Sequence, residues 1–198
     1  MMLRLSLVLF SLFFAFSTQA QKNGYMFGYV VLNGGDTLKG QLKHFGNVRS
    51  CSVVKFINRQ GRKTKFYPGD ISAYQRGLRI FHSKPNDKQV NLFGSGLIFK
   101  ELLVDGPVKL YEYFFSSQGA MMMNGPGGGM TSTSTVTQVY DVYQNGRKES
   151  VKRVPFRKWA HGYFTGNPKI SERIWNREFR YFDLPDLVRE YNRWLAGK

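Results

Sequence analysis

The sequence predicts a mainly β fold of the α+β class: an antiparallel β roll, sandwich or partly open barrel, followed by two or three C-terminal helices. Three observations support this expectation. Short aromatic and β-branched segments fill residues 25–154, and Gly, Pro, Asn and Asp turns separate them at intervals of about 8–12 residues. After Pro155 the apolar spacing becomes helical. The 198 residues are 42% hydrophobic and include one cysteine, so a packed core must hold the chain in place of a disulfide framework.

The first hairpin shows the strand pattern most clearly. Residues 25–33 (YMFGYVVLN) are aromatic and β-branched, and a Gly-Gly-Asp turn precedes the alternating segment 36–45 (DTLKGQLKHF). In that second segment Leu38 and Leu42 share one face and lysines share the other. This alternation is typical of a strand with one buried face and one face in water.

The rest of the β body is predicted from the same pattern. Further strands are expected at 52–58, 62–67, 71–75, 78–83, 89–93, 97–104, 108–115, 136–144 and 147–154. Residues 116–135 interrupt them with a run that is rich in Gly, Met, Ser and Thr and carries no charge. Because such a run buries too little surface to offset its ordering entropy, we expect a flexible loop there.

Residues 155–198 are expected to form a helical segment that packs on the sheet. Two short helices are predicted at 156–164 and 169–176, the second with Asn167 as its cap and Pro168 at its first position. Asp183 is the predicted cap of the last helix. The apolar residues of that helix recur at helical spacing and form one stripe: Leu184, Leu187, Val188, Tyr191, Trp194 and Leu195.

The N-terminus has the organisation of a secretory signal peptide. Arg4 precedes the uncharged apolar run 5–16, and small residues follow, with a predicted cut between Ala20 and Gln21. A membrane anchor is the alternative, but the run is shorter than the roughly 20 residues that span a bilayer. No cysteine follows it, so lipoprotein processing is not indicated. The sequence therefore predicts a signal peptide (1–20), a β domain (21–154) and a helical segment (155–198), located in the periplasm, at the outer membrane or outside the cell.

The charge of the chain is strongly positive. There are 29 Lys and Arg residues against 13 Asp and Glu, for a formal net charge of +16. The densest cluster, Arg59, Arg62, Lys63 and Lys65, straddles one predicted hairpin. Lysines on strands also prevent edge-to-edge aggregation, which is the structural alternative. The functional interpretation is a cationic face for a phosphate-bearing glycolipid, an acidic glycan or an acidic protein, with peripheral membrane association. Nucleic acid is not expected as the partner, because it is scarce outside the cytoplasm.

No catalytic, metal or cofactor site is predicted. The histidines are far apart in sequence, whereas zinc sites usually contain a close pair of ligands. Cys51 lacks a flanking nucleophile motif, so a buried apolar thiol is expected. Met121–Met123 and Met130 offer thioethers of the kind that bind Cu(I), but no His or Cys lies nearby. A flexible apolar loop that contacts a partner, folds over the sheet or has no role of its own is therefore preferred over a copper site.

Several short segments together resemble a family of uncharacterised exported proteins of Bacteroidetes-type bacteria. They are 28–31 (GYVV), 35–40 (GDTLKG), 66–71 (FYPGDI) with Tyr74, 100–106 (KELLVDG) with Leu110-Tyr111, and 187–192 (LVREYN). The resemblance implies a signal peptide, a β-rich body and a helical C-terminus. It implies no activity, so no site residue is carried over.

These observations favour an exported, non-enzymatic envelope module with a cationic surface, which binds an anionic envelope component or a protein complex. One alternative is a carrier of a small, lipid-like ligand inside an apolar β cavity. The other is an envelope hydrolase without a recognisable motif, which would require polar residues such as His44, Asp70 and His82 to converge. The sequence does not predict the oligomeric state.

Overall fold

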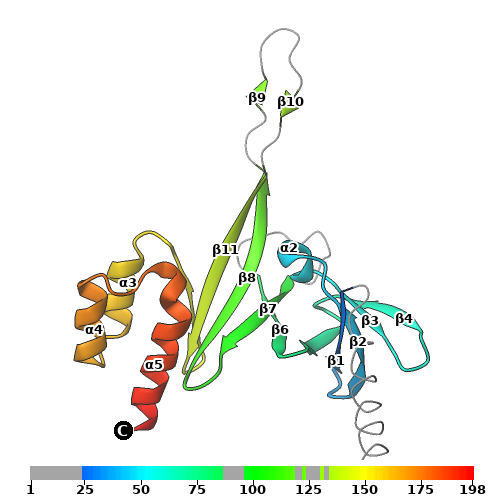
Figure 1. The fold of residues 1–198 in the computed structure, drawn as a ribbon, viewed down its shortest axis with the longest axis horizontal. Coiled ribbons are helices and arrows are strands. Elements are labelled where there is room, and N and C mark those ends of the chain that lie inside the picture. Colours follow the sequence, from blue (N-terminus) through cyan, green and yellow to red (C-terminus); the bar gives the residue numbers. More distant parts are fainter. Residues whose placement is uncertain (1–23, 87–95, 119–121, 124–129, 132–133) are drawn as a thin grey trace, which may run out of the picture.

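The computed structural model describes residues 24–86, 96–118, 122–123, 130–131 and 134–198 (Figure 1). Ten strands form one antiparallel sheet in the order β12-β11-β8-β7-β6-β5-β1-β2-β3-β4, and helices follow at the C-terminus. The predicted fold class is therefore confirmed. The strands of this sheet are β1 (Tyr25–Leu32), β2 (Thr37–Lys43), β3 (Val54–Ile57), β4 (Lys63–Phe66), β5 (Ile71–Arg76), β6 (Arg79–Pro85), β7 (Leu97–Val104), β8 (Val108–Gln118), β11 (Ser134–Gln144) and β12 (Arg147–Val151).

A short connection between β4 and β5 forces the N-terminal end of the sheet to roll up. The two strands lie at opposite ends of the run β5-β1-β2-β3-β4, which would place them about 19 Å apart in a flat sheet. Only residues 67–70 join them, and a fully extended link of this length spans about 17 Å at most. The link also turns, because the Asp70 N–H donates to the Tyr67 carbonyl over 2.9 Å. Strands β1–β5 therefore curl around a common interior.

Two glycines make room for this curl. Gly28 and Gly40 are direct partners in the β1–β2 ladder. A Cβ at Gly28 would overlap the Gln75 carbonyl oxygen of β5, and one at Gly40 would overlap the Ile57 carbonyl oxygen and the Phe56 ring. Neighbouring chain thus approaches both positions too closely for any side chain.

The curled strands enclose one of the apolar cores. Tyr74 stacks on Phe81 with ring centroids 4.5 Å apart, and Phe99 meets Tyr74 edge-on at 4.9 Å. Such aromatic pairs add about 0.5–1.5 kcal/mol each beyond the burial of their area. The buried members of this core are Val30, Leu42, Val54, Phe56, Ile71, Tyr74, Phe81 and Phe99.

A short helix and Cys51 occupy the place where β7 and β8 diverge. The pairing of β7 with β8 begins at Glu101, and the start of β7 pairs with β6 alone. The short helix α2 (Asn47–Ser50) leads into Cys51 beside this part of β7. The Cys51 carbonyl accepts from the Phe99 N–H over 2.8 Å, and its Sγ accepts from the Phe114 N–H over 3.4 Å. Burial raises the pKa of the Cys51 thiol to about 11. Cys51 is therefore the buried apolar thiol that the sequence suggested.

β8 and β11 form a long arm that extends away from the rest of the sheet (Figure 1). Their ladder begins with Val108 opposite Gln144 and ends with Gln118 opposite Ser134. The predicted loop at 116–135 is too long at both ends, because β8 continues to Gln118 and β11 begins at Ser134. Within it, β9 (Met122–Met123) pairs with β10 (Met130–Thr131). Residues 119–121, 124–129 and 132–133 lie outside the described part of the chain.

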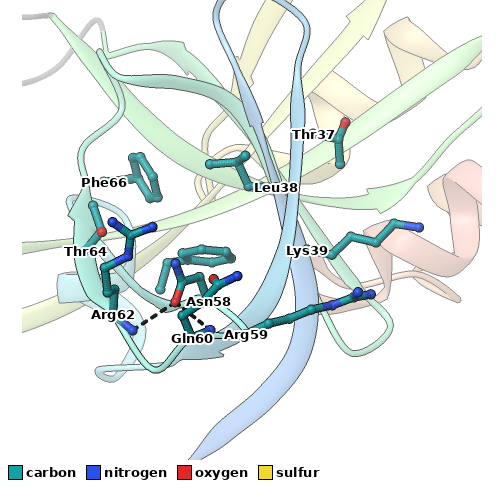
Figure 2. Close-up of a pocket in the computed structure, with 10 residues that line it drawn as sticks. Thr37, Leu38, Lys39, Asn58, Arg59, Gln60, Arg62, Thr64 and Phe66 are labelled. Carbon is teal, nitrogen blue, oxygen red and sulfur yellow. Dashed lines mark hydrogen bonds between the residues drawn. The ribbon is translucent and has the colours of Figure 1, made fainter.

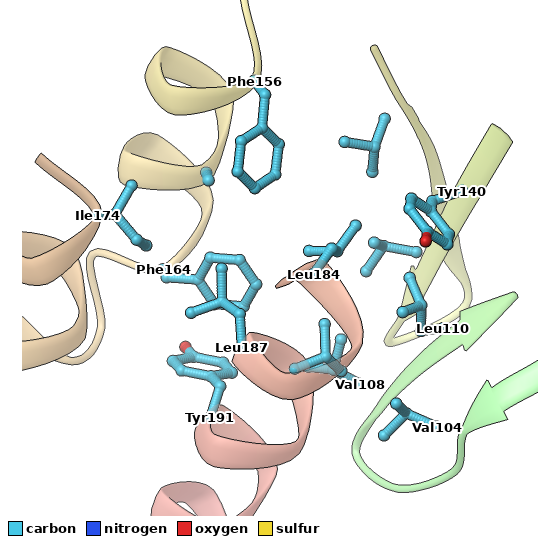
Figure 3. Packing of buried hydrophobic residues seen from close by; sticks show 14 of the residues in the cluster. Val104, Val108, Leu110, Tyr140, Phe156, Phe164, Ile174, Leu184, Leu187 and Tyr191 are labelled. Atoms are coloured by element: carbon cyan, nitrogen blue, oxygen red, sulfur yellow. The ribbon is translucent and has the colours of Figure 1, made fainter. Parts of the chain in front are cut away.

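The C-terminal helices cover the β8-β11-β12 end of the sheet (Figure 1). They are α3 (Phe156–Tyr163), α4 (Pro168–Trp175) and α5 (Leu184–Ala196), with the 3₁₀ turn η1 (Tyr181–Asp183) before α5. Figure 3 shows Leu184 and Leu187 of α5 packed between Phe164 and the strand residue Leu110. This second apolar core places the predicted stripe of α5 against the sheet.

The helix caps are partly as predicted. Asn167 caps α4, since its Oδ1 accepts from the Ile170 N–H over 3.2 Å. Asp183 precedes α5, but no side-chain cap forms there. Its Oδ2 instead accepts from the Arg180 N–H over 2.7 Å. Arg180 is the residue before η1, so Asp183 caps that turn. The expected cap of the last helix is therefore wrong.

Some predictions fall outside the described residues. These are the signal peptide, the cut between Ala20 and Gln21, and the strand at 89–93. Among the helices of the described residues, none combines the length and the apolar character that crossing a bilayer requires.

Candidate functional site

An open groove lies at the end of the curled sheet, where the turn between β3 and β4 meets β2. We call it the β-end groove. Its volume is about 640 Å³, which is within the usual range for small-ligand sites. It is lined by Thr37, Leu38, Lys39, Phe56, Asn58, Arg59, Gln60, Arg62, Thr64 and Phe66.

The β-end groove has an apolar floor and a polar rim. Leu38 and Phe66 lie over one part of it, as Figure 2 shows, and the ring of Phe56 belongs to the adjoining core. The Lys39 and Arg59 side chains extend away from Leu38 and Phe66, while Arg62 lies next to Thr64 (Figure 2). A ligand in this groove would contact both hydrocarbon and cationic groups.

The β3–β4 turn holds the two arginines in place through Asn58. The Asn58 Oδ1 accepts from the Gln60 N–H over 3.0 Å and from the Arg62 N–H over 2.9 Å. Gly61 completes the turn with a φ of 78°, a conformation that other residues rarely adopt. Because the backbone on both sides of the turn is fixed, Arg59 and Arg62 start from defined positions around the groove.

No acidic side chain of the described residues neutralises the cations of the groove. The lining includes Lys39, Arg59 and Arg62 and no Asp or Glu. Among the described residues, none of the three takes part in an ion pair. The lining also lacks His and Cys, so it offers guanidinium and ammonium donors but no acid–base or nucleophilic pair. This arrangement is suited to binding an anion.

Only two of the four basic residues in the predicted cluster line the β-end groove. Arg59 and Arg62 line the β-end groove, whereas Lys63 and Lys65 do not. Strand alternation explains the division, because Thr64 and Phe66 of β4 face the groove and their neighbours face away. Lys65 lies directly opposite Lys55, which lies opposite Lys43, so the outer face carries a row of lysines.

Sequence reasoning missed Lys39 as a member of the site. Lys39 is in β2, and the predicted cluster came from the β3–β4 hairpin alone. The alternation of segment 36–45 gives no signal for it, because it places Lys39 on the face opposite Leu38. The antiparallel pairing of β2 with β3 brings Lys39 to the start of the β3–β4 turn.

The residues that a hydrolase would need do not form one site. His44 Nδ1 lies 2.9 Å from Ser50 Oγ, Asp70 Oδ2 accepts from the Tyr67 N–H over 2.7 Å, and His82 Nδ1 lies 2.8 Å from Tyr111 Oη. In the described part of the chain, no hydrogen bond or ion pair joins any two of the three. Burial lowers the pKa of His44 and of His82, and nearby cations lower both further.

A buried ion pair joins β7 to β11 across β8. Lys100 Nζ lies 2.5 Å from Asp141 Oδ2, and the two side chains are 1% and 0% exposed. Ser150 Oγ donates to Asp141 Oδ1 over 2.6 Å, and the Lys100 ammonium lies 4.7 Å from the centroid of the Tyr113 ring. The pair is enclosed and satisfied, so we assign it to the architecture of the sheet.

No metal cluster is found among the described residues, where no group of three His, Cys, Asp or Glu side chains converges. Comparisons with protein-family models, with curated proteins and with solved structures find no match.

Proposed function

We propose that this protein is an exported, non-enzymatic module of the cell envelope that binds an anionic envelope component in the β-end groove. The observation that carries the proposal is the lining of this groove, which has three cations, no carboxylate and an apolar floor. The signal-peptide pattern of residues 1–20 supports the location in the envelope.

The ligand class follows from the two kinds of surface in the groove. Arg59 and Arg62 can each donate paired N–H groups to a phosphate or carboxylate. Leu38 and Phe66 give an apolar group a place to leave water. An amphiphilic anion can therefore contact both the cationic and the apolar side chains of the groove, whereas an inorganic ion or a neutral hydrocarbon can contact only one kind.

Calorimetric titration with dodecyl phosphate tests this proposal. Hydrogen bonds to charged groups contribute about 1.5–3 kcal/mol each, so R59Q/R62Q should weaken binding by at least about tenfold. The matched control is K63Q/K65Q, which removes the same charge from the other face of the same hairpin. The control should stay within about twofold of the wild type. Equal losses in both variants would contradict a site in the groove.

A neutral ligand separates the main proposal from the carrier alternative. The apolar floor and the volume of about 640 Å³ also suit a neutral lipid-like molecule. If dodecanol binds as tightly as dodecyl phosphate, the carrier is favoured and the cationic rim is not a determinant. If dodecyl phosphate binds more tightly and high salt weakens it, the anionic ligand is favoured.

A further inference from the structure

We infer that the helical layer contains a second anion site, one that binds a small ligand carrying two phosphate groups. We call it the helix-side pocket. Its volume is about 750 Å³, and it lies between the segment that leads into α3 and the segment that joins α4 to η1. It is lined by Arg153, Val154, Pro155, Phe156, Arg157, Lys158, Arg177, Phe179, Arg180, Tyr181 and Phe182.

The cations of this pocket stand on two walls. Arg153, Arg157 and Lys158 belong to the first segment, and Arg177 and Arg180 belong to the second. All five side chains are exposed. The rest of the lining is apolar or aromatic: Val154, Pro155, Phe156, Phe179, Tyr181 and Phe182. The pocket therefore presents positive charge from two directions above aromatic rings.

No carboxylate of the described residues neutralises these five cations. None of them forms an ion pair there, and no Asp or Glu lines the pocket. The acids nearest in sequence to Arg180 are engaged elsewhere: Glu178 is paired with Arg173 at 2.7 Å, and the Asp183 Oδ2 accepts from the Arg180 backbone N–H.

Two other arginines of the helical layer form ion pairs with acidic side chains. Arg173 is paired with Glu178 at 2.7 Å and with Glu190 at 2.5 Å, and Arg189 is paired with Asp186 at 2.7 Å. Acidic partners are thus available in this layer but absent from the helix-side pocket. An exposed group of like charges in one concave site favours an external anion.

Local packing holds several of the arginines in position. The Arg153 guanidinium lies 5.1 Å from the centroid of the Phe182 ring, and that of Arg157 lies 5.3 Å from the centroid of the Trp175 ring. A guanidinium stacked on a ring keeps its N–H edge free to donate. Arg177 has a φ of 66° because it ends α4: its N–H donates to the Ile174 carbonyl and the Glu178 N–H to the Arg173 carbonyl, each over 3.1 Å.

The number and placement of the cations point to two phosphates. One phosphate monoester carries about −1.5 to −2 charges, which leaves most of five cations without a partner. A ligand with two phosphates gives each wall one anionic group, and arginine binds phosphate through paired N–H bonds. The aromatic rings can then contact the part of the ligand between them. The two phosphates can be linked as a diphosphate or separated by a sugar, and the test distinguishes these sources.

This inference does not depend on the β-end groove, since the two sites share no residue. The experiment is a calorimetric titration with three probes: inorganic phosphate, inorganic diphosphate and fructose 1,6-bisphosphate. At least one probe with two phosphates should bind about tenfold more tightly than inorganic phosphate. Tighter binding of diphosphate assigns the linked form, and tighter binding of the sugar bisphosphate assigns the separated form.

Variants locate the site and separate it from the groove. R157Q/R180Q removes one cation from each wall and should weaken the tighter probe by at least about tenfold. K169Q/R193Q removes the same charge from exposed positions of α4 and α5 outside the pocket, and it should leave affinity within about twofold, as should R59Q/R62Q.

R157K/R180K keeps the charge but not the paired N–H geometry, so it should give an intermediate loss even if the glutamine variant fails to fold. Equal affinity for all three probes, or equal losses in K169Q/R193Q, would overturn the inference.

Discussion

At the scale of single residues, Gly40 tests the explanation for the curl of the sheet. Any side chain at Gly40 would overlap the Ile57 carbonyl oxygen and the Phe56 ring. Gly40→Ala should therefore lower the free energy of unfolding by about 1–3 kcal/mol, the usual cost of overpacking. Urea titration measures this change. Gly34→Ala is the control, because a Cβ there meets nothing within 4 Å. Similar stability of the two variants would mean that the close approach at Gly40 is unimportant.

The Lys100–Asp141 pair gives a second prediction for single residues. Removing one partner leaves a buried charge, so Lys100→Met or Asp141→Leu alone should each cost about 3–5 kcal/mol. The double variant K100M/D141L removes both charges and should be more stable than either single variant. Thermal and urea unfolding of the three variants check this order. A double variant whose loss equals the sum of the single losses would show that the charges are not coupled.

His82 predicts how stability changes with pH. Burial lowers the pKa of His82 below its ordinary value of 6.5, and Lys84 and Lys109 lower it further while Asp105 opposes them. The unfolded chain binds a proton at this histidine more readily than the folded chain does. The contribution of His82 to the free energy of unfolding is therefore fully present above pH 6.5 and decreases as the pH falls below that value. His44 acts in the same direction. The urea midpoint should decrease from pH 7.5 toward pH 5.5, and His82→Asn should make that decrease smaller. An unchanged slope in the variant would exclude His82 as a cause.

At the scale of elements, Asn192 connects the last helix to the sheet. Its Oδ1 accepts from the Val108 N–H over 2.9 Å and its Nδ2 donates to the Val108 carbonyl over 2.7 Å. Gly106 lies against this side chain, where a Cβ would overlap the Asn192 amide. Two segments of the family resemblance, 100–106 and 187–192, therefore meet at one contact between a β turn and α5.

Asn192→Ala should leave the buried Val108 N–H and carbonyl without partners and cost about 1–3 kcal/mol per unsatisfied group. Chemical unfolding followed by tryptophan fluorescence measures the loss, since Trp194 is two residues away on α5. Arg193→Ala is the control, because this neighbour is exposed. If both variants lose the same small amount, the Asn192 contact does not anchor the helix.

The elements were predicted where local pattern determines them. The β1–β2 hairpin follows from alternation and from its Gly-Gly-Asp turn, and α5 follows from a stripe repeated over 13 residues. The arm was predicted too short, because Ser134 and Thr135 have no apolar alternation and are held by pairing with β8 instead. The sequence left a roll, a sandwich and a partly open barrel as alternatives, since the curl depends on the place of β5 beside β1, which is a long-range pairing.

At the scale of the whole molecule, the candidate site was only partly predictable for the same reason. Arg59 and Arg62 were found because a hairpin brings them together within four residues of chain. Lys39 is placed beside them by the pairing of β2 with β3, whereas Lys63 and Lys65 do not line the groove. The helix-side pocket gathers residues from two segments, 153–158 and 177–182, whose proximity depends on the packing of the helical layer.

Basic residues of the described part of the chain gather on several surfaces of the molecule. The β-end groove lies at the curled end of the sheet, and the helix-side pocket lies at the helical end, with the central strands between them. The outer lysine row (Lys43, Lys55 and Lys65) adds a third basic area. A ligand that bridges two of these sites would gain effective concentration for the second contact.

Sedimentation of the full-length protein with envelope membranes from its native host tests the central claim most directly. The wild type should sediment with membranes at about 0.01 M salt and be released at about 1 M, where charges are screened beyond about 3 Å. R59Q/R62Q should be released at lower salt than K63Q/K65Q, although both variants carry the same net charge. Binding that ignores salt, or identical release of the two variants, would contradict an anionic envelope ligand in the β-end groove.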